Sequence, residues 1–124
     1  KYLEYSILNS AYAEKIMDRQ EIKLDDCERA LKSLWDDFWN LRERWGQRKL
    51  SWQDVLEEGL ILWGRQKYLL RQISRLRENV ATTDEKFKSV NQEATNLLVH
   101  LSWCLDPATS FEKIPEIPIF SQGT

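Results

Sequence analysis

The sequence predicts an all-α protein: an elongated three-helix bundle of left-handed sense, with one long central helix and an extended, proline-containing C-terminal tail. Composition is the first support, because the 124 residues include 4 Gly and 3 Pro. Average chains contain about 7% Gly and about 5% Pro, so both are at about half their usual share. A β-sandwich or barrel needs turn residues every few positions. Long helices are the class that remains.

The second support is a heptad repeat, in which apolar residues recur at alternating steps of three and four. The repeat comprises Leu24, Cys27, Leu31, Leu34, Phe38, Leu41, Trp45, Arg48, Trp52, Val55, Gly59, Leu62, Gln66, Leu69, Ile73, Leu76 and Val80. Such a repeat is typical of helices packed side by side with a left-handed sense. Gly46 is a candidate break, but a turn would usually reset the phase. We therefore expect one continuous helix over residues 22–80, about 88 Å long.

A second apolar stripe runs beside the first, through Trp35, Leu56, Trp63 and Leu70. Two adjoining stripes bury a wider arc than one partner helix can cover. The stripes therefore predict two neighbours for the long helix, in a three-helix bundle or, as the alternative, a four-helix bundle. Trp35, Trp45, Trp52 and Trp63 lie on or beside these stripes, and we expect them to be buried.

Two shorter helices and a tail complete the predicted organisation, in which residues 1–105 form the bundle and residues 106–124 the extended tail. The shorter helices are expected at about residues 1–18 and 83–105. Thr82 and Glu85 have the spacing of a capping box at a helix start. Pro107 ends the last helix, because the residue before a proline is disfavoured in the helical region. The tail reads either as a disordered linker or, since it is rich in Ile, as a strip docked on the bundle or on a partner.

Several function classes are excluded by composition and spacing. A net charge of -2 argues against a nucleic-acid binder. No apolar run is long enough for a transmembrane segment. One histidine, His100, and two distant cysteines, Cys27 and Cys104, provide no zinc spacing. We expect no metal, no cofactor, no catalytic residue and a non-enzymatic protein. Two cysteines make no disulfide framework, so a cytoplasmic setting is expected.

The candidate functional residues are partner-binding residues, and they fall into three groups. Trp39, Ile61 and Tyr68 lie off both apolar stripes, where aromatic and aliphatic anchors indicate either a protein interface or a fourth packed helix. Lys67, Arg71 and Arg75 are spaced by four on one helical face. Either this basic face pairs with acidic residues of the next helix (Asp84, Glu85 and Glu93), or it binds an acidic partner such as a filament surface or anionic lipid. Ile117 and Phe120 are the tail candidates.

A resemblance to a known family is carried by the stretch around Gly46. Trp35, Leu41, Arg48, Leu50 and Trp63 follow one another in the kind and order found at the junction between two spectrin-type repeats. The stretch from 22 to 80 resembles that junction, in which the last helix of one three-helix repeat continues into the first helix of the next. The resemblance implies a cytoskeletal or nuclear-envelope scaffold without an active site.

Together these observations predict a scaffold or tether that binds other proteins, in a homo-oligomer or a hetero-oligomer. The alternative is an obligate helical subunit of a multi-chain complex of the kinetochore or vesicle-tethering type. The two differ in one cheap observation, since an obligate subunit would not be a stable soluble monomer by itself.

Overall fold

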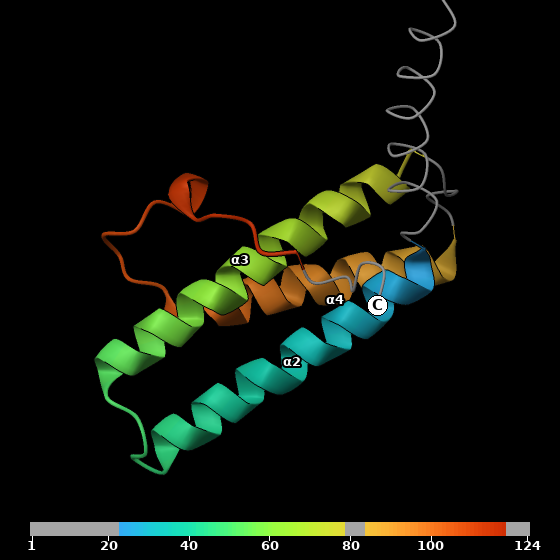
Figure 1. Cartoon of the computed structure of the whole chain (residues 1–124). Helices are drawn as coiled ribbons and strands as arrows, with labels where there is room; N and C mark the ends of the chain where they lie inside the picture. Colours follow the sequence, from blue (N-terminus) through green and yellow to red (C-terminus); the bar gives the residue numbers. More distant parts are fainter. Residues whose placement is uncertain (1–22, 79–83, 119–124) are drawn as a thin grey trace, which may run out of the picture.

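The computed structural model of the chain describes residues 23–78 and 84–118 (Figure 1). Three α-helices occupy this part of the chain: α2 at Leu24–Gly46, α3 at Trp52–Leu76 and α4 at Glu85–Leu101. Two short 3-10 helices follow, η1 at Ser102–Cys104 and η2 at Phe111–Lys113, and these residues contain no strand. The all-helical prediction is confirmed. The helix predicted over residues 1–18 and the residues Thr82 and Phe120 lie outside the described ranges.

The three helices alternate in direction and pack together. α2 and α3 run antiparallel through a short turn, and α4 runs beside α2 in the same direction (Figure 1). Each helix contacts the other two. One hydrophobic core joins them, with Leu34, Phe38, Leu69 and Leu97 among its fully buried side chains. The heptad positions on both sides of the turn thus form the buried stripes, as the sequence predicts.

The prediction of one continuous helix over residues 22–80 is wrong, because α2 ends at Gly46 and α3 begins at Trp52. Arg48 has a φ of 59°, a left-handed conformation that usually falls to glycine. The Arg48 N–H donates to the Trp45 carbonyl at 2.9 Å, and the Lys49 N–H donates to the Arg44 carbonyl at 3.0 Å. These two bonds form a Schellman motif, which ends a helix by satisfying its last carbonyls.

A capping box marks the start of α3, although the heptad repeat continues across this position. The Asp54 N–H donates to the Ser51 hydroxyl at 3.1 Å, and the Ser51 N–H donates to the Asp54 carboxylate at 3.3 Å. The heptad phase is the same in both helices, because Leu41 of α2 and Val55 of α3 are separated by two whole heptads of sequence. A turn of this length therefore leaves the repeat unbroken while the chain reverses direction.

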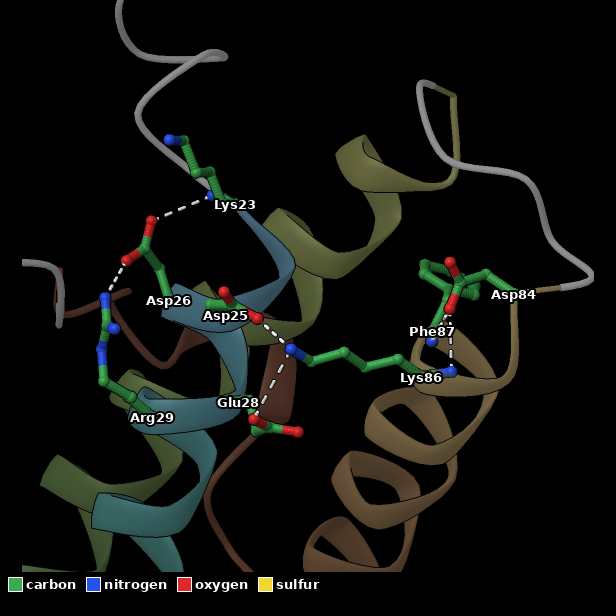
Figure 2. A network of polar contacts seen from close by, with 8 residues as sticks. All are labelled: Lys23, Asp25, Asp26, Glu28, Arg29, Asp84, Lys86 and Phe87. Atoms are coloured by element: carbon green, nitrogen blue, oxygen red, sulfur yellow. Dashed lines mark hydrogen bonds and ion pairs between the residues drawn. The ribbon is translucent and has the colours of Figure 1, made fainter.

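The last helix also begins later than predicted. Asp84 is its N-cap, and its carboxylate accepts from the N–H groups of Lys86 at 2.8 Å and Phe87 at 3.2 Å. Lys86 then reaches across to α2, where it pairs with Asp25 and approaches Glu28 (Figure 2). This pairing lowers the pKa of the Asp25 carboxyl and raises the pKa of Lys86, because each charge is stabilised by the other. The contact joins the N-terminal ends of the two parallel helices.

The chain after α4 returns along α3. Ile114 is buried, and Ile117 donates its N–H to the Gly64 carbonyl of α3 at 3.1 Å. Of the two alternatives for the tail, the docked strip therefore holds for residues up to 118. We call residues 105–118 the strap.

Candidate functional site

One face of the bundle carries a continuous group of aromatic side chains, which we call the aromatic surface. Its members come from α2, the first residue of α3, the end of α4 and η1: they are Trp35, Trp39, Arg42, Trp45, Trp52, His100 and Trp103. Helical spacing explains the α2 members, because Trp35, Trp39 and Arg42 are three or four residues apart and share one side. The buried ring of Phe38 supports the surface from below through edge contacts with Trp39, His100 and Trp103.

The rings form two contacting groups, which the Arg42 guanidinium joins along the surface. Trp35 and Trp39 stack with centroids 6.1 Å apart, and the His100 ring meets Trp35 edge-on at 5.0 Å. The Arg42 guanidinium lies 5.0 Å from the Trp103 ring and 5.8 Å from the Trp39 ring, within the range of cation–π attraction. Such pairs favour fixed ring positions, so the surface is organised before any partner arrives.

The same surface is open to solvent. Trp39 is 48% exposed, Trp52 42% and Trp45 37%, and the neighbouring α4 residue Val99 is 67% exposed. Trp39 is thus outside the core, as its heptad position predicts. The prediction that Trp45 and Trp52 are buried is wrong, because both flank the turn, where the heptad line leaves the packed helices. Trp63 is buried as expected, and Trp35 is half-buried.

Two of the predicted basic residues of α3, Lys67 and Arg71, lie on a different face, against the strap. The Lys67 Nζ donates to the carbonyls of Phe111 at 3.2 Å, Glu112 at 3.0 Å and Ile114 at 3.0 Å. Arg71 pairs with the Glu116 carboxylate at 3.1 Å. Arg75 is half-buried on the same helix. The described partner of Arg71 is therefore the chain's own strap, rather than Asp84, Glu85 or Glu93 of α4.

Of the remaining candidates, Ile61 lies apart from both groups, whereas Tyr68 and Ile117 belong to the face of α3 that the strap covers. Ile61 is 52% exposed and lines a shallow hollow of about 200 Å³ between α2 and α3. Two ion pairs border this hollow, Arg65 with Asp37 at 2.6 Å and Arg44 with Glu58 at 2.7 Å. Tyr68 is buried, with a cation–π contact from Arg71, and Ile117 is in the strap. The structure thus distributes the predicted partner-binding residues over three places.

Only Trp39 of the aromatic surface was predicted as a partner-binding residue. Trp35, Trp45 and Trp52 were expected in the core, and no place in an interface was predicted for Arg42, His100 and Trp103. A spacing signal existed, since Arg42 follows Trp39 by three residues and Trp103 follows His100 by three. The contact between the two pairs depends on how α2 and α4 pack, which no local spacing reveals. A hydrogen bond between Nδ1 and the Asn96 carbonyl, 2.8 Å apart, also orients the His100 ring.

Both cysteine thiols of the described residues are buried. Burial raises the pKa of Cys27 to about 12 and that of Cys104 to about 11, so both thiols stay protonated at neutral pH. Within residues 23–78 and 84–118, no three His, Cys, Asp or Glu side chains gather closely enough to hold a metal ion. The described residues thus offer two features to other molecules: the exposed rings around the Arg42 guanidinium, and the face of α3 that the strap covers.

Comparisons with protein-family models, with curated proteins and with solved structures found no match to this chain. None of the helices in the described part of the chain combines the length and the apolarity needed to cross a bilayer.

Proposed function

We propose that this chain is a non-enzymatic helical scaffold or tether that binds another protein through the aromatic surface. The observation that carries the proposal is the exposure of Trp39, Trp45 and Trp52 around Arg42. Tryptophan and arginine are the residues most enriched among interface hot spots, and charged residues other than Arg are depleted there. The pre-ordered rings reduce the entropy cost of binding, which favours recognition over a purely structural role.

The spectrin-like relationship is the finer part of the same proposal. It draws on the residues quoted around Gly46 and on the arrangement of three helices with alternating directions. A left-handed sense of packing, which the heptads predict, is part of this proposal. Under this proposal the module operates in the cytoplasm, at the cytoskeleton or the nuclear envelope, as one element of a longer assembly. The protein partner would be a cytoskeletal component.

The experiment compares proteins captured in cells by the full chain and by two variants. In Trp39→Ala/Arg42→Ala the aromatic surface loses its anchor and its cation, whereas Lys88→Ala removes an exposed charge of α4 outside that surface. We expect a defined protein to be captured by the wild type and by Lys88→Ala, and to be lost with the double variant. The double variant should lose about 1–2 kcal/mol of unfolding free energy, because the Trp39 ring packs against the Trp35, Phe38 and His100 rings. Circular dichroism checks that its helices persist. Equal capture by all three chains would contradict the proposal.

The alternative function is an obligate subunit of a multi-chain helical complex, which the exposure of Val99 beside the aromatic surface favours. Light scattering of the purified chain distinguishes the two. A monomer that stays soluble at all concentrations supports the scaffold and contradicts the obligate subunit. Aggregation or self-association that Trp39→Ala suppresses would support the subunit instead.

A further inference from the structure

The outer face of α3 is shaped to receive an extended chain. Gly64 is what opens it, because a Cβ placed there would lie 2.6 Å from the Pro115 carbonyl oxygen and 2.9 Å from the Ile117 side chain. Contacts that short do not occur between real side chains and backbone, so any other residue would push the strap away. The strap approaches until the Ile117 N–H donates to the Gly64 carbonyl at 3.1 Å.

Two cations on the same face recognise features of the strap that another chain could supply. Lys67 lies three residues beyond Gly64, and its ammonium donates hydrogen bonds to three backbone carbonyls, those of Phe111, Glu112 and Ile114. Arg71 lies one turn further and pairs with Glu116. The face thus recognises two carbonyls of the short 3-10 helix η2 and the carbonyl of Ile114, followed by the Glu116 carboxylate. Ile114 begins the extended, proline-containing stretch after η2, and such stretches make no internal hydrogen bonds.

The strap itself is lightly held by side-chain burial. Ile114 is its buried side chain, whereas Phe111 remains 38% exposed although its ring meets Trp63. The ion pair between Arg71 and Glu116 is solvent-exposed, with side chains 51% and 25% accessible, and exposed pairs contribute little to stability. A segment with the same chemistry could therefore compete for the face.

We propose that the outer face of α3 is a second binding site, for an extended segment of another protein with the pattern aliphatic–Pro–acidic–aliphatic, and that the strap occupies this site until the partner exchanges with it. The model for the ligand is the strap's own sequence, Ile114-Pro115-Glu116-Ile117. This site goes beyond the aromatic surface and involves none of its residues. Recognition of preformed extended segments by a helical groove costs little ordering entropy.

The test uses a fluorescent peptide with the sequence of residues 108–118 and the full chain in three forms. The release variant, Glu116→Lys/Ile117→Asp, places a lysine opposite Arg71 and a charge at a half-buried position, so the strap leaves the face. We expect it to bind the peptide about tenfold tighter than the wild type, because an occupied site lowers the apparent affinity by the fraction that is open. Anisotropy measures the affinity, and circular dichroism checks that the helices persist.

The glycine provides a matched control. Added to the release variant, Gly64→Ala should abolish peptide binding, whereas Gly46→Ala should not, because a Cβ at Gly46 meets nothing within 4 Å. Should the release variant fail to fold, Ile114→Asp is the second way to free the strap. Equal peptide binding by wild type and release variant, or binding that survives Gly64→Ala, would overturn the proposal. Concentration-dependent dimers of the wild type that Gly64→Ala removes would overturn it too, since a second copy's strap would then be the occupant.

The Trp39→Ala/Arg42→Ala chain keeps the two proposals separate. We expect it to bind the peptide, after strap release, as well as the release variant does. Loss of partner capture with intact peptide binding contradicts neither the second site nor its assignment to α3. Loss of peptide binding alone leaves the proposed function standing.

Discussion

The aromatic surface and the outer face of α3, which the strap covers, both lie outside the core but differ in their exposure to solvent. The sequence left a partner open for both: Trp39 indicated a protein interface or a fourth helix, and Lys67 and Arg71 indicated an acidic partner or pairing within the chain. The first remains open, with Trp39 48% exposed, whereas the second is occupied by residues of the same chain. Exposure of a predicted surface therefore depends on where the downstream chain runs.

The positions of the glycines explain which side of the bundle η1 and the strap cover. A Cβ at Gly59 would lie 2.5 Å from the Cys104 carbonyl oxygen, so η1 enters against α3 at this point. A Cβ at Gly64 would meet Pro115, so the strap continues along the same helix. α2 has its glycine at position 46, at its end, and bulky rings along its open side. Small residues thus mark the covered face, and tryptophans mark the open one.

The largest test of this comparison removes the support beneath the open surface. Phe38→Ala should lower the free energy of unfolding by about 3–5 kcal/mol, because Phe38 is fully buried and its ring touches four others. Urea unfolding measures the loss. Phe111→Ala in the strap, where the ring is 38% exposed, should cost far less. Similar losses at both positions would show that the strap is as integral to the fold as the core.

A smaller effect is expected beneath the strap. The Trp63 Nε1 donates to the Leu101 carbonyl at 3.0 Å and closes the end of α4. Trp63→Phe should cost about 1 kcal/mol, because the Leu101 carbonyl loses the stronger of two donors and keeps only the Cys104 thiol at 3.3 Å. The melting temperature measures the change, and Trp39→Phe on the open surface provides the control. If Trp39→Phe destabilised the chain equally, the difference between the two faces would be lost.

The smallest effect is a decline of stability at alkaline pH. The folded pKa values of Cys27 and Cys104, about 12 and about 11, exceed the ordinary value of 9.0 because burial disfavours the thiolate. Their contribution is complete below pH 9 and is lost as the pH rises through the folded values, since the unfolded thiols then ionise first. The melting temperature should fall as the pH rises from about 9 to about 10.5, and less in Cys27→Ala/Cys104→Ala. An identical fall in that variant would remove the thiols as its cause.

The heptad predicted most of the core on both sides of the turn, but it placed the exposed Trp45 and Trp52 in the core and the buried Tyr68 outside it. It could not predict the turn, because residues 47–51 preserve the phase and Arg48, rather than a glycine, adopts the left-handed conformation. The local signal was the capping box of Ser51 and Asp54, which marks a helix start inside an unbroken repeat.

The candidate site was predicted in part for a related reason. Single residues such as Trp39 could be placed from the heptad, because exposure follows the position on one helix. Contacts between Arg42 and Trp103, or between Lys67 and the strap carbonyls, join segments far apart in the sequence. Local periodicity contains no information about such pairs. The apolar content of the tail did indicate docking, but the face that receives it depends on Gly64.

The turn at residues 47–51 determines where the chain can accept inserted residues. In a continuous helix, one inserted residue would rotate everything beyond it by about 100° and carry the apolar stripe off the core. Here the helix on each side has its own terminator, the Schellman bonds before the turn and the Ser51 cap after it. An insertion beside Lys49 would lengthen the connection without rotating either helix. This connection is the place where the bundle can accept new sequence, and with it new attachments.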